Sequence, residues 1–285
     1  MFENIIEASK RTVSRGEGPG GPTDETVDGL SETLVDDETA AHVLTSLNPI
    51  QRIHEGRAES IAPRRDGRSF LLATDRRVLF VADDGALSSV DIAVPLAEVD
   101  AVVHRSSLLE SALVVETVDE ERISISPSDG DAEAVGAYIE RTAESWREMG
   151  AALDSARETL ETYRDETDRY EDPLRASQRI RGRLALADDA RSRYADTPSE
   201  RLAEHLRSVA AELADALHTE AERLTDGVHP DDEGATAVYE QARGVLEHAR
   251  QIAVEHADAD TETFDESMVR FDEAIERSRW VWGET

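Results

Sequence analysis

The sequence contains no cysteine among its 285 residues. This absence excludes disulfide bonds, zinc sites built from thiolates and catalysis by a cysteine nucleophile, and it is typical of a reducing compartment. Lysine is almost absent as well, because Lys10 is the only lysine among 31 basic residues. The other basic residues are therefore all arginines.

Long apolar runs are also missing. No run approaches the 18 residues that a membrane-spanning helix needs. The first residues, "MFENIIEASKRTV", lack the continuous apolar core of a signal peptide. These features predict a cytoplasmic protein, with membrane association left open.

Acidic residues dominate the charge. The chain has 63 acidic and 31 basic residues, which gives a formal net charge of −32. A dense carboxylate surface with arginine in place of lysine is typical of halophilic, and in particular haloarchaeal, cytosolic proteins. At molar salt the Debye length is about 3 Å, so the repulsion within such a chain is largely screened.

The first 23 residues are expected to form a separate N-terminal segment. Phe2, Ile5 and Ile6 fall on one side of a short amphipathic helix, and a linker rich in Gly and Pro follows. This helix could pack on the domain behind it. The alternative is that Phe2, Ile5 and Ile6 contact a membrane or a partner groove.

Residues 24–148 are expected to form one domain. Residues 27–47 are predicted to be helical, with Val43, Leu44 and Leu47 on an apolar stripe. From residue 51 the apolar period changes from 3.6 to 2, which predicts six or seven strands between 51 and 126. A helix is predicted to start near residue 131. The fold class is therefore α+β, with a small antiparallel barrel or sandwich capped by a helix.

This order of elements resembles a prokaryotic pleckstrin-homology-like (PH-like) domain. The resemblance covers about residues 30–148 and is carried by "LVDDETAAHVL", "FLLATDRRVLFVADDG" and "VPLAEVDAVVHRSSLLESALVVET". A hydrophobic pair, a Thr-Asp-x-Arg motif and a second hydrophobic run match the family pattern at Leu71, Leu72, Thr74, Asp75, Arg77, Val78 and Leu79. The prokaryotic domains of this type have no general lipid-binding role that the resemblance would carry over.

Residues 149–285 are expected to form a helical bundle or coiled-coil domain. Apolar residues continue at alternating spacings of three and four through Gly150, which favours one long helix over two helices that meet there. Pro173 is predicted to end this helix, and three or four more amphipathic helices follow. Many of the apolar positions are alanine, which buries little area, so homo-oligomerisation through this region could supply the missing burial.

No catalytic or metal-binding motif is present. The sequence lacks GxGxxG, a P-loop, HExxH and GxSxG, and its eight histidines do not show metal-ligand spacing. We therefore expect no enzyme activity, no catalytic residue, no metal and no cofactor.

Two arginine-rich windows run against the overall charge. The first supplies a candidate ligand-binding group for an anion, made of Arg64, Arg65, Arg68 and Arg77. The alternative is that these arginines pair with neighbouring acids. In the second window Arg175, Arg179 and Arg183 form one stripe, which we expect to pair with an acidic helix of the same chain. We do not expect nucleic acid as a partner, because counterion release drives little binding in molar salt.

The sequence thus predicts a non-enzymatic interaction or assembly protein. In this interpretation the PH-like domain docks a protein partner of unknown identity, and the helical region oligomerises or acts as a spacer. The alternative is a peripheral membrane adaptor that binds lipid through residues 2–15 and the arginines near 64–77.

Overall fold

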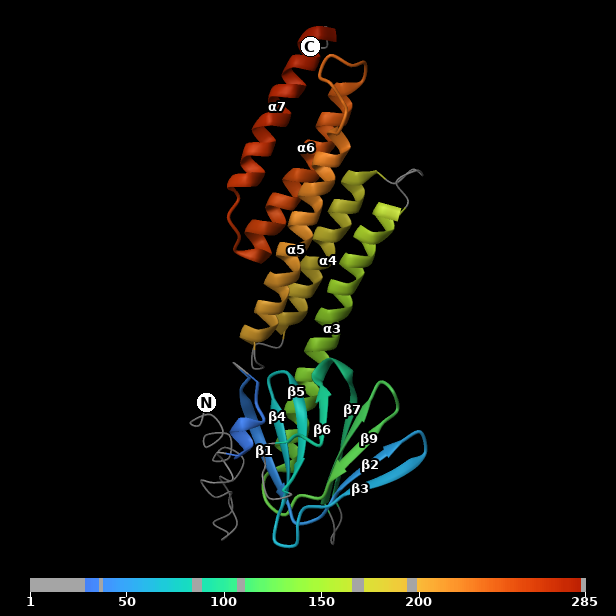
Figure 1. Cartoon of the computed structure of the whole chain (residues 1–285), viewed down its shortest axis with the longest axis vertical. Coiled ribbons are helices and arrows are strands. Elements are labelled where there is room, and N and C mark those ends of the chain that lie inside the picture. The colour runs from blue at the N-terminus through green and yellow to red at the C-terminus, as the bar shows by residue number, and fades with distance from the viewer. Residues whose placement is uncertain are drawn as a thin grey trace. The chain divides into compact units, whose positions relative to one another are not determined.

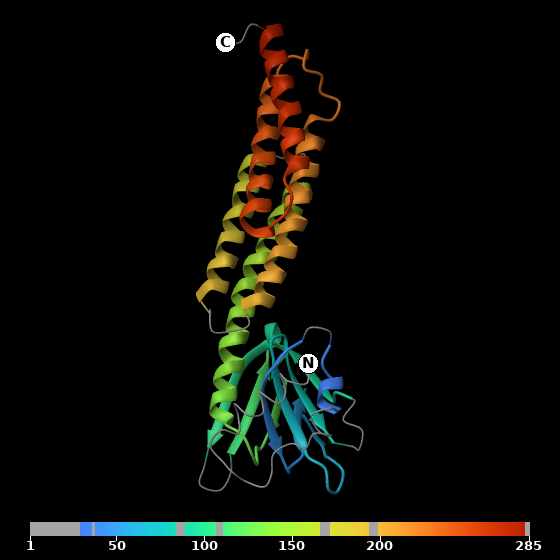
Figure 2. The same cartoon turned by 90° about the vertical axis from the view of Figure 1, so that its left-hand side faces the viewer.

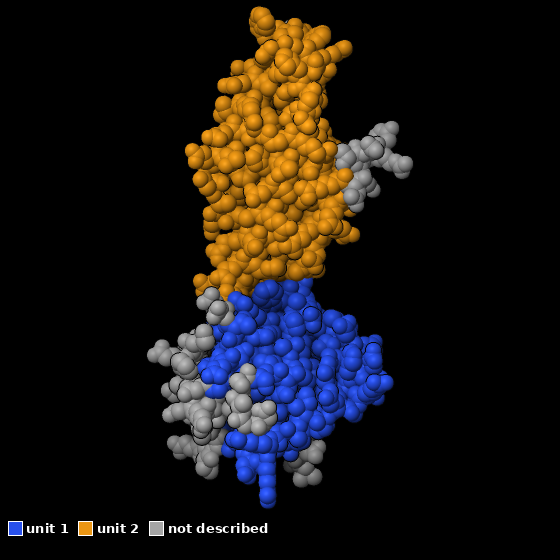
Figure 3. Space-filling model, viewed as in Figure 1, with its two compact units in different colours: residues 1–147, 194–198 blue, residues 148–193, 199–285 orange. Residues whose placement is uncertain are grey.

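The computed structural model describes residues 29–35, 38–83, 89–106, 111–165, 172–193 and 199–282 (Figure 1). The chain divides into two compact units, called unit 1 (residues 1–147 and 194–198) and unit 2 (residues 148–193 and 199–285) (Figure 3). Phe2, Ile5 and Ile6, with the rest of the predicted N-terminal segment, lie outside the described residues.

Unit 1 contains two antiparallel sheets, neither of which closes into a barrel. The four-stranded sheet has the order β1-β4-β5-β6, with β1 at Ala40–Ser46, β4 at Ser69–Thr74, β5 at Arg77–Ala82 and β6 at Ile92–Pro95. The five-stranded sheet has the order β3-β2-β9-β8-β7, with β2 at Ile50–His54, β3 at Arg57–Ile61, β7 at Val99–Ser106, β8 at Ser111–Thr117 and β9 at Arg122–Ile125.

The central strands of the four-stranded sheet are buried on both faces. Every residue of β4 is buried, and so is every residue of β5 after Arg77. One face packs on Leu30 and Leu34, which precede the sheet in the chain. Burial on both faces explains why β4 and β5 read as continuous apolar runs rather than as alternating patterns.

The other face of this sheet lines the main core of unit 1. Both sheets contribute to this core, together with the first turns of helix α3 (Ala132–Asp165). Figure 2 shows these turns of α3 running beside the sheets. Val135 and Ile139 of α3 are fully buried there. The predicted capping helix is therefore confirmed, and it is part of the hydrophobic core.

The prediction of a helix over residues 27–47 is wrong for most of its described length. Residues 29–32 are helical, but residues 40–46 form strand β1, which pairs with β4 from Ala40↔Thr74 to Ser46↔Ser69. Val43 and Leu44 suit either a helical stripe or a strand that is buried on both faces. Pairing with β4, which is distant in the sequence, decides between the two.

Unit 2 is helical, and α4, α5 and α7 pack on α6. The long helix α3 passes through Gly150 without a break, as the register of apolar residues predicted. The helices that follow are α4 (Pro173–Arg193), α5 (Ser199–Thr225), α6 (Ala235–Ile252) and α7 (Glu262–Trp282). Helix α6 contacts α4, α5 and α7, and a π-helical turn, Ala253–Ala257, follows it directly.

Replacing Gly150 with alanine should stabilise the helical region. A Cβ atom at Gly150 would meet nothing within 4 Å. Because glycine in a helix interior is less favourable than alanine, Gly150→Ala should raise the free energy of unfolding by about 0.5–1 kcal/mol, measured by urea denaturation. Gly67→Ala is the contrasting variant, since its Cβ would lie 2.7 Å from the Asp83 carbonyl oxygen and should destabilise unit 1. A loss of stability in Gly150→Ala would contradict an unstrained, continuous helix.

Candidate functional site

Three of the four arginines predicted to bind an anion lie in the segment that joins β3 to β4. Arg64 and Arg65 are exposed, and Arg68 is half-buried. The segment is fixed against the end of β5, because the Arg64 amide donates to the Asp83 carbonyl at 2.7 Å and the Asp83 amide donates to the Arg68 carbonyl at 2.8 Å. Arg64 Nε also lies 3.6 Å from the Asp83 carboxylate.

Arg77 does not join this group. It is the first residue of β5, whereas Arg68 directly precedes β4, and β4 pairs antiparallel with β5. The six residues of β4 separate the two ends of this hairpin by about 20 Å. The structure therefore brings together Arg64, Arg65 and Arg68 but not Arg77, and anion binding by the first three stays a prediction.

Arg77 instead binds the buried carboxylate of Glu38. The Arg77 Nε donates to Glu38 Oε1 at 2.9 Å, and Nη2 donates to Oε2 at 2.7 Å. The Glu38 side chain has no exposed surface, whereas that of Arg77 is 23% exposed. The Thr74 hydroxyl and the Val35 amide donate to the same carboxylate at 2.8 and 3.0 Å. This carboxylate is thus fully occupied by partners from the protein.

The surroundings of Glu38 favour its charged form. Burial raises the pKa of Glu38, but hydrogen bonds from Arg77, Val35 and Thr74, with the charge of Arg77, outweigh burial and hold the pKa below its ordinary value. A carboxylate that stays ionised and has no free position is suited to holding the fold together. It is not suited to accepting a proton from a substrate.

The remaining residues of the Thr-Asp-x-Arg motif hold neighbouring segments. Asp75 Oδ1 accepts the Thr39 amide at 2.9 Å, and the Asp75 amide donates to the Thr39 carbonyl at 3.0 Å. Two α3 side chains donate to the same turn: Trp146 Nε1 to the Asp75 carbonyl and the Tyr138 hydroxyl to the Thr74 carbonyl, each at 3.3 Å. The motif therefore joins the β4–β5 turn to residues 38–39 and to α3.

Sequence reasoning missed Glu38. The sequence feature that could have pointed to Glu38 is its position two residues before a strand. A single acidic residue carries little information, however, in a chain with 63 of them. Pairing with Arg77 depends on β1 lying beside β4, which the predicted helix at 27–47 excluded.

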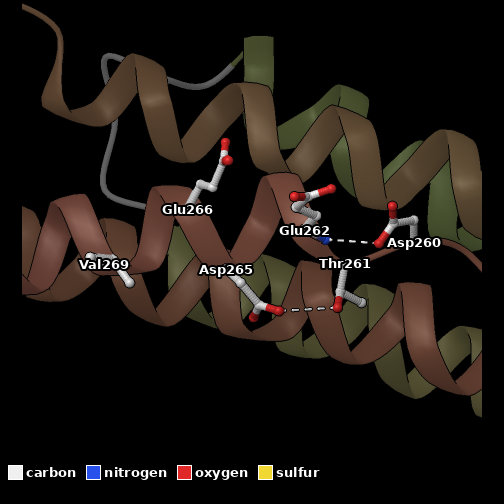
Figure 4. A pocket seen from close by; sticks show the side chains of 6 residues that line it. All are labelled: Asp260, Thr261, Glu262, Asp265, Glu266 and Val269. Atoms are coloured by element: carbon white, nitrogen blue, oxygen red, sulfur yellow. Dashed lines mark hydrogen bonds between the residues drawn. The ribbon is translucent and has the colours of Figure 1, made fainter.

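An acidic hollow lies at the start of α7 (Figure 4). It is lined by Asp260, Thr261, Glu262, Asp265, Glu266 and Val269. Several of these groups form hydrogen bonds at the N-terminus of α7. Asp260 accepts the Glu262 amide at 3.1 Å, and the Thr261 hydroxyl donates to Asp265 at 3.1 Å. Asp265 is also paired with Arg250 of α6. Asp260 and Asp265 therefore have structural partners, whereas Glu262 and Glu266 form no ion pair within the described residues.

His256 has a buried titratable side chain without a hydrogen bond among the described residues. It lies in the π-helical turn after α6, is 8% exposed, and has no hydrogen-bond partner for either ring nitrogen among the described residues. Its Nε2 lies 4.0 Å from Glu255, which is too far for a hydrogen bond. Across the described ranges, no three metal-ligating side chains gather into a group that could hold a metal ion.

Burial also controls the charge of His256. Burial lowers the pKa of His256 below its ordinary value, and the Arg181 and Arg191 guanidinium groups act in the same direction. The carboxylates of Asp188 and Glu255 oppose this lowering but do not cancel it. His256 is therefore held in its neutral form in the folded protein at pH 7.

None of the helices in the described ranges combines the length and apolarity required to cross a membrane. A comparison with models of known protein families finds no match. A comparison with curated protein sequences finds no match either.

Removing Arg77 should destabilise unit 1. Arg77→Ala leaves the Glu38 charge buried without its main partner, so the free energy of unfolding should fall by about 3–5 kcal/mol in denaturant titrations. Because the pKa of Glu38 is lowered on folding, its stabilising contribution should be present above pH 4.5 and lost as the pH falls further. Arg65→Ala, on an exposed loop, is the control and should change stability little. Equal stability of the two variants would contradict this role of Arg77.

Acid should weaken unit 2 through His256. Because its pKa is lowered on folding, the unfolded chain takes up a proton more readily, and stability should fall as the pH drops from 7 to 5. His256→Leu should flatten this pH dependence in thermal melts, although His205 and His248, whose pKa values burial also lowers, would retain part of it. His54→Leu, on the exposed end of β2, is the control. An unchanged pH profile in His256→Leu would show that His256 does not contribute.

Proposed function

We propose that this protein is a non-enzymatic interaction and assembly protein. In this proposal unit 1 is a PH-like module that docks an extended segment of a protein partner. The helical region links copies of the chain or acts as a spacer. The single observation that carries the proposal is an exposed strand, β3, at the edge of the five-stranded sheet.

The topology of unit 1 supports the PH-like assignment. Strands β1 and β2 follow each other with a short break, and they pair with β4 and β3, which also follow each other. Counted as two bent strands shared between both sheets, these four segments reduce the total to seven antiparallel strands before α3. The sequence resemblance implies six or seven antiparallel strands and a closing helix.

Strand β3 offers backbone groups to a partner. It is joined to β2 by a two-residue turn, Glu55–Gly56, in which both residues have positive φ, as in a type I′ hairpin. His54 and Arg57 are therefore the hydrogen-bonded pair next to the turn. Hydrogen-bonded and non-hydrogen-bonded pairs alternate along an antiparallel ladder, so the backbone N–H and C=O groups of Ala58 and Ser60 point away from β2. No described strand covers this side, so an extended peptide could add to it as a further strand.

The side chains around β3 would make its pairing with an added segment selective. Arg57 and Glu59 are exposed on β3 itself, and charges of this kind discourage indiscriminate pairing between edges. Ile53 of the neighbouring strand β2 is 44% exposed and lies opposite Ala58. An apolar side chain of an added segment could pack on Ile53, which would give the interaction specificity beyond its backbone bonds.

The membrane-adaptor alternative has less support. It uses residues 2–15, which lie outside the described residues, and the arginines near 64–77, of which Arg77 is bound to Glu38 at the other end of the β4–β5 hairpin. A reduced site made of the three loop arginines would still have to attract an anionic surface to a chain of net charge −32.

Strand addition can be tested at Ser60. Peptides selected from a random library against the full-length protein should slow hydrogen exchange at the amides of Ala58 and Ser60. Ser60→Pro removes an outward N–H without breaking the ladder to β2, so peptide binding should be lost while the thermal melt changes little.

Ser60→Ala is the matched control, because it also removes the hydroxyl that accepts from Gln51 but keeps the N–H. It should bind the peptides as the unmodified protein does. Undiminished binding to Ser60→Pro, or protection confined to residues 62–68, would overturn strand addition at β3. Binding to anionic lipid vesicles that is lost in Arg64→Ala/Arg65→Ala would favour the membrane adaptor instead.

A further inference from the structure

Helix α4 carries two arginines that form no ion pair within the described part of the chain, Arg175 and Arg183, which is unusual in unit 2. Ion pairs join most arginines of this unit to acids, for example Arg157 to Glu212, Arg164 to Glu220, Arg181 to Glu255, Arg243 to Asp272 and Arg277 to Asp231. Arg175 and Arg183 form no ion pair with any residue in the described ranges. The expected match of the α4 stripe to an acidic helix of the same chain is therefore not made by these two residues.

Six residues along the exposed face of α4 form what we call the α4 strip. Its residues follow at alternating spacings of four and three: Arg175, Arg179, Gly182, Leu186, Asp189 and Arg193. All six are exposed. Leu186 lies in the middle of the strip and is 53% exposed, whereas Ile180, Leu184 and several alanines are buried on the other side of the same helix.

Helix α7 has a strip of opposite charge. The α7 strip consists of Glu262, Glu266, Val269, Glu273, Glu276 and Trp280, again at alternating spacings of four and three. Its four glutamates form no ion pair within the described part of the chain, whereas Asp265 and Asp272 on the flank of α7 pair with α6. Val269 is 58% exposed and Trp280 is 86% exposed.

The two strips match when the helices run in opposite directions. In both strips eleven residues, or about 17 Å of helix, separate the end group from the central apolar residue. Leu186 then lies opposite Val269 while Arg175 lies over Trp280, in position for a cation–π contact. In the same register Arg179 faces Glu276 and Arg193 faces Glu262, while Arg193 also pairs with Glu148 and Asp189 of its own chain.

The parallel register fits less well. It places Leu186 opposite Glu273 and Val269 opposite Gly182, so neither exposed apolar residue meets another. The antiparallel register has one like-charge pair, Asp189 with Glu266. This repulsion is moderated because Asp189 already lies 3.3 Å from the Arg193 guanidinium.

We propose that the α4 strip of one copy docks antiparallel on the α7 strip of a second copy of this chain. Both strips are exposed in the structure, so α4 and α7 of one chain do not cover each other; both pack on α6 instead. This inference rests on the assembly part of the proposed function and identifies its surface. Because the two surfaces differ, the contact is heterologous and builds rings or open chains.

Two single substitutions and their mixture test this contact. Leu186→Glu places a charge in the α4 strip, and Val269→Glu does so in the α7 strip. Sedimentation velocity at physiological ionic strength should show oligomers for the unmodified protein and monomers for each variant alone. An equimolar mixture should form a one-to-one dimer and nothing larger, because only one intact α4 strip and one intact α7 strip remain in each pair.

Val254→Glu is the matched control, since Val254 is 52% exposed in the same unit but lies on neither strip. It should assemble like the unmodified protein, and circular dichroism should show that all three variants fold. Oligomers that persist in Leu186→Glu or Val269→Glu would overturn this surface and leave assembly by another surface in place. A monomeric unmodified protein at all concentrations would overturn both this contact and the assembly role, while peptide binding at β3 would be unaffected.

Discussion

Unit 1 depends on one buried charge and the groups that surround it. Glu38 has no exposed side-chain surface, and its carboxylate is held by Arg77, Thr74 and the Val35 amide. The turn that supplies Arg77 and Thr74 also binds Thr39 and receives hydrogen bonds from α3. A buried ion pair adds little net stability when complete but costs several kcal/mol when one partner is lost. We infer that this network acts mainly by specifying a single arrangement of residues 38–39, the β4–β5 hairpin and α3.

In unit 2 most ion pairs lie at or near the surface rather than in the core. Its arginines are distributed over the helices and mostly meet carboxylates on neighbouring helices, at or near the surface. Such exposed pairs contribute little individually, so the buried aliphatic and alanine side chains must supply most of the stability. Arg175 of α4 and four glutamates of α7 form no ion pair within the described residues, and large apolar residues are exposed on the same two helix faces. This coincidence is the physical basis for assigning a docking role to those two helices.

Regular, locally encoded features could be predicted from the sequence. The apolar register through Gly150 predicted the continuous α3, and alternating patterns after residue 51 predicted two-layer antiparallel structure. Residues 40–46 were misread as helix because a segment buried on both faces has no alternation to reveal a strand. The prediction that Arg77 groups with Arg64, Arg65 and Arg68 did not hold, for a related reason. Residues close in sequence can lie at opposite ends of a hairpin, and only the pairing of β4 with β5 shows this.

By itself, the sequence determined the chemistry available to this protein. It supplied a chain without thiols, with nearly all its positive charge on arginine and with apolar spacing that changes from strand-like to helical. Tertiary structure decided how those groups are used. It buried Glu38 beside Arg77, turned Ala58 and Ser60 toward an open edge, and left Leu186 and Val269 uncovered. These outcomes depend on contacts between residues far apart in the chain, whereas composition and periodicity report only local preference.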